Sequence, residues 1–353
     1  MDILVLTGDG IGPEITKATM AVTEAVNKKY RLGLVYTHED IGFVSLKKHG
    51  ITITDTVVDM ALKADGVIIG PVSHNEYPPR SEGGLNPSGE LRIKMDLFAN
   101  IRPSRSRPGL SKFDTNMDII IVRENTEGFY ADRTMWKGYG EFMPTPDLAM
   151  AVRKVTREGS NRVCRAAFEL AMTRPRKMLT IVHKQNVLRM SDALFLEEAY
   201  KVAKEFPEIT VNDVLVDAMA AHLVRDPSRY DVIVTTNMFG DILSDEASEI
   251  SGSLGVAGSL NAGYEHAYAQ AQHGSAPDIA GKDLANPTSL ILSAGMLLNW
   301  LGSRHNRPEY SLAASDISNA IDKALLSPET RTKDLGGKLG TEAFTKEILN
   351  IIA

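Results

Sequence analysis

Several side chains in this sequence are of types and spacings suited to substrate binding and catalysis, and the first of these are three arginines. Arg92 falls in a predicted helix, Arg102 at a predicted turn before Pro103, and Arg123 at the end of a predicted strand. Three converging guanidinium groups would bind a dicarboxylate through paired hydrogen bonds, and they stay charged at any relevant pH. Solvated or ion-paired arginines remain the alternative on spacing alone.

Two titratable side chains follow strand ends and suit proton transfer. Tyr130 comes a few residues after the strand that carries Arg123, and Lys184 directly follows the apolar run 178–182. A tyrosine beside cations is a candidate proton donor, and a partly desolvated lysine is a candidate base. A packing role for Tyr130 and ordinary exposure for Lys184 are the alternatives that the residues leave open.

Three aspartates suit a divalent cation. Asp241 and Asp245 are four residues apart at the start of a predicted helix, so their carboxylates share one helix face, and Asp217 ends a predicted strand. Like charges at that spacing destabilise a helix unless a cation neutralises them, and ligation by oxygen alone suits Mg²⁺ or Mn²⁺. A helix N-cap with solvated carboxylates is the competing interpretation.

Alternating strands and helices must position these groups. Apolar runs predict strands at 3–7, 34–36, 118–122, 177–182, 210–216 and 231–235, and 61–69 is predicted to be a helix end that runs into a buried strand. Helical periodicity is typical of several segments between these strands. Leu- and Ala-rich stretches predict helices at 287–301 and 317–326. This alternation favours an α/β fold with a largely parallel sheet. The Pro- and Gly-rich stretch 73–89 is predicted to be an exposed loop beside a site.

A glycine loop follows the first strand, in the sequence Gly8-Asp9-Gly10-Ile11-Gly12-Pro13-Glu14. The dinucleotide-binding pattern G-x-G-x-x-G requires glycine at position 13, where this chain has proline, so the match fails. Proline suits the first position of a helix, and Glu14 suits the positive end of the helix dipole. A tight strand-to-helix turn explains this loop as well as a cofactor site does.

Composition excludes several classes of protein. The 353 residues carry 39 Lys and Arg against 45 Asp and Glu, which gives a formal net charge of −6 and no global field for nucleic acid or an anionic membrane. No apolar run reaches the roughly 18 residues of a membrane span, and the first residues do not resemble a signal peptide. The single Cys164 cannot form an internal disulfide, so we expect a cytoplasmic protein. The length predicts about two domains, and no linker separates them, so we expect them to be interleaved.

Five motifs resemble those of the isocitrate/3-isopropylmalate dehydrogenase family of β-decarboxylating dehydrogenases. They are ANIRP at 99–103, VRENTEG at 122–128, HKQN at 183–186, NMFGDILSDE at 237–246 and HGSAPDIAG at 273–281. The resemblance covers nearly the whole chain and implies an α/β fold that is not a Rossmann fold. It further implies one domain from 1–98 and 252–353, a second from 99–251, and a homodimer whose subunits share each active site.

The resemblance also implies a role for each group. Arg92, Arg102 and Arg123 would bind the carboxylates of a malate, while Asp241 and Asp245 would hold Mg²⁺ or Mn²⁺ together with Asp217 of the partner subunit. Lys184, also from the partner, would assist deprotonation of the 2-hydroxyl, and Tyr130 would protonate the enolate left by loss of CO₂. The divalent ion would stabilise that enolate as a Lewis acid.

The cofactor implied by the resemblance is NAD. Asp278 falls where NAD-dependent members carry an acidic residue on the adenosine ribose, and its carboxylate would repel the 2′-phosphate of NADP. Glu82 and Asn186 are expected near the nicotinamide. The remaining predicted cofactor contacts are Ile11, His273, Gly274, Ser275, Ala276 and Asn286.

The choice of substrate depends on the segment 70–92. Isopropylmalate enzymes place leucines before the first substrate arginine, whereas this chain has Asn86 and Ser88. Unpaired polar groups facing an isopropyl group would lower affinity, so we expect a polar or small 3-substituent, as in isocitrate, homoisocitrate, tartrate or D-malate. 3-Isopropylmalate remains an alternative. A non-catalytic regulatory subunit is a further alternative, although the tyrosine, lysine and metal-binding aspartates that such subunits tend to lose are all present.

Overall fold

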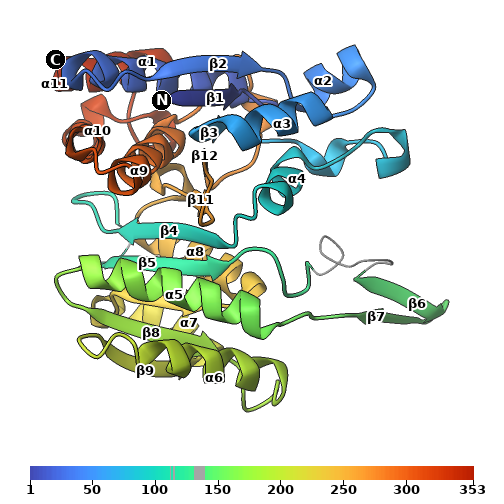
Figure 1. Ribbon diagram of the computed structural model, residues 1–353. Coiled ribbons are helices and arrows are strands. Elements are labelled where there is room, and N and C mark those ends of the chain that lie inside the picture. Colours follow the sequence, from blue (N-terminus) through green and yellow to red (C-terminus); the bar gives the residue numbers. More distant parts are fainter. Residues whose placement is uncertain (112, 114–115, 131–139) are drawn as a thin grey trace. The chain divides into compact units, whose positions relative to one another are not determined.

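The structure is a computed structural model that describes residues 1–111, 113, 116–130 and 140–353. The chain divides into two compact units. Unit 1 comprises Met1–Met95, Arg107–Leu110 and Ser253–Ala353, and unit 2 comprises Asp96–Ser106 and Ser111–Gly252. Each unit contains both strands and helices, which confirms the predicted α/β class (Figure 1).

Unit 1 is built on strands in the order β2-β1-β3-β12-β11. The pairs β1–β2, β1–β3 and β3–β12 are parallel, whereas β11–β12 is antiparallel. The strands are β1 (Asp2–Leu6), β2 (Val35–Glu39), β3 (Gly66–Ile69), β11 (Leu260–Ala262) and β12 (Ala267–Gln270). The helices are α1 (Gly12–Tyr30), α2 (Gly42–His49), α3 (Asp55–Lys63), α4 (Pro87–Lys94), α9 (Thr288–Arg304), α10 (Pro308–Ala324) and α11 (Thr341–Ile352).

Unit 2 is built on strands in the order β4-β5-β10-β8-β9, and an antiparallel hairpin of β6 and β7 extends beyond them (Figure 1). The pairs β5–β10, β10–β8 and β8–β9 are parallel, and β4–β5 is antiparallel. The strands are β4 (Ala99–Arg105), β5 (Asp118–Glu124), β6 (Glu141–Thr145), β7 (Leu148–Ala151), β8 (Met178–His183), β9 (Thr210–Leu215) and β10 (Val232–Thr235). The helices are α5 (Arg157–Thr173), α6 (Ser191–Ala203), α7 (Val216–Arg225) and α8 (Asn237–Ser251).

Two apolar cores cover the two faces of the unit 2 sheet. Successive strand residues point to opposite faces, so Val122 and Val234 pack with α5 and α6, whereas Ile121 and Ile233 pack with α7 and α8. Both faces are apolar, as expected of parallel strands buried on both sides.

The structure corrects three local predictions. Arg102 does not lie at a turn, because residues 99–105 form strand β4, in which Pro103 lies opposite Ile120. Asp217 does not end a strand but lies in the first turn of α7. The predicted loop 73–89 is interrupted by two short 3₁₀ turns, and its last three residues begin α4. No helix among the described residues is both long and apolar enough to span a membrane.

Candidate active site

Arg102 and Arg123 lie on the same face of two neighbouring strands of unit 2. In the antiparallel register of β4 and β5, Asn100 lies opposite Arg123, and Arg102 is two residues further along β4. A two-residue step returns to the same face of a strand. Both guanidinium groups therefore approach α8, and both side chains are almost entirely buried, with 9% and 3% exposure.

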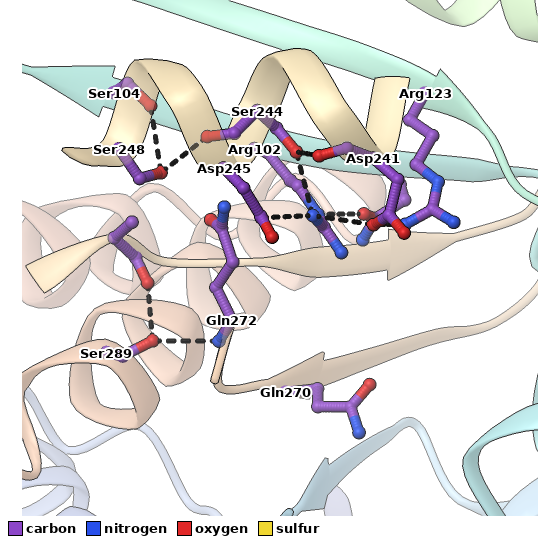
Figure 2. Close-up of polar contacts among 12 residues, drawn as sticks. Arg102, Ser104, Arg123, Asp241, Ser244, Asp245, Ser248, Gln270, Gln272 and Ser289 are labelled. Carbon is purple, nitrogen blue, oxygen red and sulfur yellow. Dashed lines mark hydrogen bonds and ion pairs between the residues drawn. The ribbon is translucent and has the colours of Figure 1, made fainter. Parts of the chain in front are cut away.

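The carboxylates of α8 pair with these arginines (Figure 2). Arg102 Nη1 donates to Asp241 Oδ1 and to Asp245 Oδ1, each at 3.2 Å, and Arg123 Nη1 donates to the same Asp241 oxygen. Ser244 Oγ accepts from Arg102 Nη1 at 2.8 Å, and Asn237 Oδ1 accepts from Arg123 Nε and Nη2 at 3.0 and 2.7 Å. The two buried positive charges are thus matched by two carboxylates that are 36% and 50% exposed.

Tyr130 joins this cluster from the segment that follows β5. Its hydroxyl donates to Asp241 Oδ2 at 3.4 Å, and the Arg123 guanidinium lies 5.7 Å from the centre of its ring. The buried Glu124 carboxylate holds the intervening turn, because it accepts from Thr126 N at 2.7 Å and Glu127 N at 2.8 Å. Two predicted substrate arginines, one predicted proton donor and two predicted metal ligands are therefore brought together within unit 2.

Lys184 and Asp217 form a separate pair. Lys184 Nζ donates to Asp217 Oδ1 at 2.5 Å, and this lysine holds the pKa of the Asp217 carboxyl below its usual range. The Lys184 main chain is fixed by the fully buried Asp192, whose carboxylate accepts from Lys184 N at 2.6 Å and pairs with Arg153. Among the described residues, no group of three or more His, Cys, Asp or Glu side chains could hold a metal ion. Asp217 therefore does not complete a three-carboxylate site with Asp241 and Asp245 of its own chain.

The loop that carries Lys184 also lines a surface pocket of about 380 Å³. Asn186, a predicted cofactor contact, is an exposed member of the lining, together with His183, Gln185, Arg189 and Leu215. His183 Nδ1 accepts from Gln185 N at 3.1 Å, so its Nε2 carries the proton and donates to Asp213 at 3.0 Å. Partial burial of Asp213 opposes its ionisation, but hydrogen bonds from Tyr200 and then His183 hold the pKa of its carboxyl below the usual range.

The remaining predicted substrate residues lie on α4 in unit 1. Asn86 caps this helix, because its side chain accepts from Gly89 N at 3.2 Å. The Ser88 hydroxyl is buried, 3.1 Å from both Tyr268 Oη and Gln270 Oε1. Arg92 Nε donates to Tyr268 Oη at 2.8 Å. Tyr268 and Gln270 were not among the predicted site residues, because no local pattern relates them to a helix about 180 residues earlier.

Three loops of unit 1 meet at the predicted cofactor residues. Ile11 N donates to Ser275 O at 2.8 Å, and Ser275 Oγ lies 2.7 Å from Ser73 Oγ. Gly10, at φ +56°, permits this approach, because a Cβ there would lie 2.0 Å from Ser275 O. The carboxylate of Asp9 accepts from Ser73 N at 3.0 Å. The glycine loop thus connects β1 to α1 and holds two other loops in place.

The other predicted cofactor residues differ in their burial and in the hydrogen bonds that they already make within the protein. His273 Nε2 is buried without a hydrogen-bond partner among the described residues, and burial lowers the pKa of this histidine. Asp278 is exposed, and Lys282 Nζ donates to its carbonyl oxygen at 2.7 Å. Asn286 is buried, with its amide nitrogen donating to Asp334 and its oxygen accepting from Thr288 N. Gly274 and Glu82 are exposed, and Ala276 adopts a left-handed conformation with φ +37°.

Comparisons with known proteins agree over the full length of the chain. The model of the isocitrate/isopropylmalate dehydrogenase family matches residues 2–352. The chain is 39% identical to 3-isopropylmalate dehydrogenase of Archaeoglobus fulgidus, over 99% of both chains. It is 40% identical to isocitrate/homoisocitrate dehydrogenase of Thermus thermophilus, over 99% of this chain and 98% of the relative.

The chain belongs to the isocitrate/isopropylmalate dehydrogenase family.

The structure agrees with this assignment. The crystal structure of isocitrate dehydrogenase from Methylococcus capsulatus superposes with a TM-score of 0.87 at 35% identity, over 99% of both chains. The expected isocitrate/isopropylmalate dehydrogenase fold is therefore confirmed. Membership of this family makes the protein an oxidoreductase of the decarboxylating hydroxy-acid type. Family members named for isopropylmalate and for isocitrate/homoisocitrate are about equally similar to this chain, so similarity alone does not select a substrate.

Proposed function

We propose that the protein catalyses the oxidative decarboxylation of a 3-substituted (2R)-malate, with NAD and with Mg²⁺ or Mn²⁺. The observation that carries this proposal is the cluster of Arg102, Arg123, Tyr130, Asp241 and Asp245 in unit 2. It combines two cations for carboxylates, a phenol within hydrogen-bond distance of a carboxylate, and a pair of carboxylates on one helix face. Arg92 is the third proposed substrate arginine.

The donor set of α8 fits a hard divalent cation. Asp241 and Asp245 offer accessible carboxylate oxygens one helical turn apart, which suits Mg²⁺ or Mn²⁺ with water and substrate oxygens as the other ligands. When bound, the ion supplies Lewis-acid stabilisation of the substrate oxygen at C2. The two arginines also stay paired when the ion and the substrate bind, because the carboxylates of the substrate replace Asp241 and Asp245 as partners of Arg102 and Arg123.

Lys184 and Tyr130 are proposed to move the two protons. Lys184 in its neutral, deprotonated form accepts the proton of the 2-hydroxyl when C2 is oxidised, and Tyr130 delivers a proton to C3 after CO₂ has left. Lys184 holds a fixed position for this task, because Asp217 contacts its Nζ and Asp192 contacts its main-chain nitrogen. The hydroxyl of Tyr130 is held by Asp241, which links the proton donor to the proposed metal ligands.

The residues of 273–286 fit the adenosine part of NAD. His273 offers a buried Nε2, without a hydrogen-bond partner in the described part of the chain, that accepts a hydrogen bond from an exocyclic amine. Asp278 offers an exposed carboxylate to ribose hydroxyls. When bound, NAD accepts the hydride from C2. The proposed contacts from Ile11, Ser275 and Asn286 involve the main chain or placement of the loop, because the side-chain polar atoms of Ser275 and Asn286 already bond within the protein.

A homodimer that shares its active sites explains why Asp217 and Asp241 belong to separate clusters. We propose that Asp217 and Lys184 of one subunit complete the cluster of Asp241 in the other. The hairpin of β6 and β7 supplies a surface for this contact, because all its residues are exposed, including apolar ones. An isolated two-stranded hairpin is marginally stable in water, so this one requires a covering partner. The exposed large apolar side chains of this hairpin are Phe142, Met143, Leu148 and Met150.

A polar or small 3-substituent is proposed, because no leucine side chain replaces Asn86 or Ser88 before Arg92. One observation favours 3-isopropylmalate as the second candidate. Asn86 caps α4 and Ser88 bonds to Tyr268 and Gln270, so neither polar group is left unpaired to oppose an apolar substituent.

A panel of (2R)-malates that differ only at C3 tests the substrate assignment. The purified protein is assayed for NADH formation with Mn²⁺ and D-malate, tartrate, isocitrate, homoisocitrate or 3-isopropylmalate, and kcat/KM is compared. We expect the highest kcat/KM for a polar or small substituent. A preference for 3-isopropylmalate by tenfold or more would select the second candidate, and a folded dimer that is inert toward every malate would favour the non-catalytic alternative.

A further inference from the structure

Tyr268 and Gln270 place two polar side chains on one face of β12. Residues two apart in a strand point to the same side of the sheet, and here both reach α4. Their targets, Ser88 and Arg92, are four residues apart and therefore share one face of that helix. Tyr268 is fully buried, although its hydroxyl needs hydrogen-bond partners in such an environment.

The hydrogen bonds among these four residues have a defined direction. Gln270 Oε1 can only accept, so the Ser88 hydroxyl donates to it at 3.1 Å. The Tyr268 hydroxyl then donates to Ser88, whose Oγ lies at 3.1 Å and whose carbonyl oxygen lies at 3.3 Å. Arg92 Nε can only donate, and it completes the chain by donating to Tyr268 Oη at 2.8 Å. A contact of 3.5 Å joins Arg92 Nη2 to Gln270 Oε1.

This chain of hydrogen bonds fixes the guanidinium plane of Arg92. One of its five N–H donors is bound to Tyr268, and the only other contact found among the described residues is the long one to Gln270. The remaining donors are left for a ligand. Because a guanidinium binds a carboxylate through two parallel N–H groups, its plane must be set correctly before the ligand arrives.

We propose that Tyr268, supported by Ser88 and Gln270, is a positioning residue that orients Arg92 for the carboxylate of the malate. The proposal rests on the proposed function, in which Arg92 binds substrate. It assigns the Ser88 hydroxyl to this network, where it holds Tyr268 in place.

Tyr310 provides a matched control in the same unit. It is also fully buried, and its hydroxyl donates to the carbonyl oxygen of Leu32 at 2.9 Å, away from Arg92. Tyr268→Phe and Tyr310→Phe each remove one buried phenolic hydroxyl and keep the ring. A purely structural role for Tyr268 predicts that both variants behave alike.

The test measures steady-state kinetics and melting of the full-length protein with whichever malate of the panel is turned over. For Tyr268→Phe we expect KM for the malate to rise about tenfold, with kcat and KM for NAD changed less than about twofold. Thermal-shift titration with the same malate and Mn²⁺, without nucleotide, should show a matching loss of affinity. Tyr310→Phe should lower the melting temperature but leave both KM values unchanged.

An unchanged malate KM in Tyr268→Phe, or equal changes in both tyrosine variants, would overturn the proposal. Arg92→Lys distinguishes failure of the positioning role of Tyr268 from failure of the binding role of Arg92, because it keeps the charge and removes the paired N–H geometry. If Arg92→Lys weakens malate binding and Tyr268→Phe does not, positioning by Tyr268 is wrong and the proposed function stands. If Arg92→Lys has no effect either, the role of Arg92 in the proposed function is wrong.

Discussion

At the scale of single residues, the candidate site is a balance of opposite charges. Arg102 and Arg123 are buried guanidinium groups, and such charges are costly unless they are paired. Asp241 supplies one carboxylate to both of them, and Asp245 supplies another to Arg102. The same four side chains thus balance one another's charges, and they are the groups proposed to bind a divalent ion and a dicarboxylate.

Lys184→Met tests the proposed base. The variant keeps a chain of similar length but cannot accept a proton, so we expect kcat to fall by at least about a hundredfold. The melting temperature should change little, because Asp217 is the one side chain among the described residues that contacts Lys184 Nζ, and it is 65% exposed. Lys177→Met is the control, since Lys177 pairs with the exposed Glu208 in the same unit. Activity retained by Lys184→Met would refute its role as base.

Asp278 tests the choice of nicotinamide cofactor. Asp278→Asn removes the charge that would repel a 2′-phosphate, and Asp278→Lys replaces it with an attractive one. The ratio of kcat/KM for NADP to that for NAD should therefore rise in the order wild type, Asn, Lys, while the malate KM stays constant. A ratio that is the same in all three proteins would contradict a contact between Asp278 and the adenosine ribose.

At the scale of elements, loops from distant parts of unit 1 are held together by close main-chain contacts. Gly10 lies against Ser275 O, and Ser275 in turn contacts Ser73, so three loops converge where the cofactor is proposed to bind. Helix α4 and strand β12 are also held together, in this case by the side-chain hydrogen bond between Ser88 and Tyr268. The precision of the proposed binding groups in unit 1 therefore depends on contacts between elements.

Gly10→Ala tests this loop arrangement against Gly33→Ala. Both glycines have positive φ, which disfavours alanine by about 1 kcal/mol. Only at Gly10 would the added Cβ also collide with main chain, since nothing lies within 4 Å of the Cβ position of Gly33. We expect KM for NAD to rise at least about tenfold in Gly10→Ala and to stay unchanged in Gly33→Ala. Equal effects in the two variants would show that the contact with Ser275 is unimportant for binding.

Helices and strands could be predicted from the sequence where their buried positions are apolar and regularly spaced. Strand β5 was evident because residues 119–122 are consecutive apolar residues covered on both faces, and α8 placed Asp241 and Asp245 one turn apart as expected. Strand β4 was not predicted because its buried positions include the polar residues Asn100, Arg102 and Ser104. The strand also contains Pro103, which is unusual inside a strand. The partners of Arg92 were missed because the contact with Tyr268 depends on tertiary structure and not on local spacing.

At the scale of the whole molecule, the proposed activity depends on two copies of the chain. Lys184 and Asp217 contact each other in one place, while Asp241 gathers Arg102, Arg123 and Tyr130 in another. A shared site makes dimerisation a requirement for catalysis. It also means that two inactive variants can restore activity to each other in a mixed dimer, when one lacks the group that one subunit supplies to the site and the other lacks the group that its partner supplies.

Complementation between Lys184→Met and Asp241→Asn tests the shared site. Each homodimer should be inactive, whereas the mixed dimer contains one site built from the intact half of each chain. With the two chains co-expressed under different affinity tags and purified in tandem, we expect about half the wild-type activity per dimer. If each chain built its own complete site, the mixed dimer would be as inactive as its parents.

The most direct test of the proposed reaction is the stoichiometry of its products. The purified protein is incubated with NAD, Mn²⁺ and the best malate of the panel, and NADH and released CO₂ are measured together, with and without a chelator. We expect equal amounts of NADH and CO₂, and neither product once the metal is removed. NADH without CO₂, or the same turnover in the presence of the chelator, would contradict metal-dependent oxidative decarboxylation.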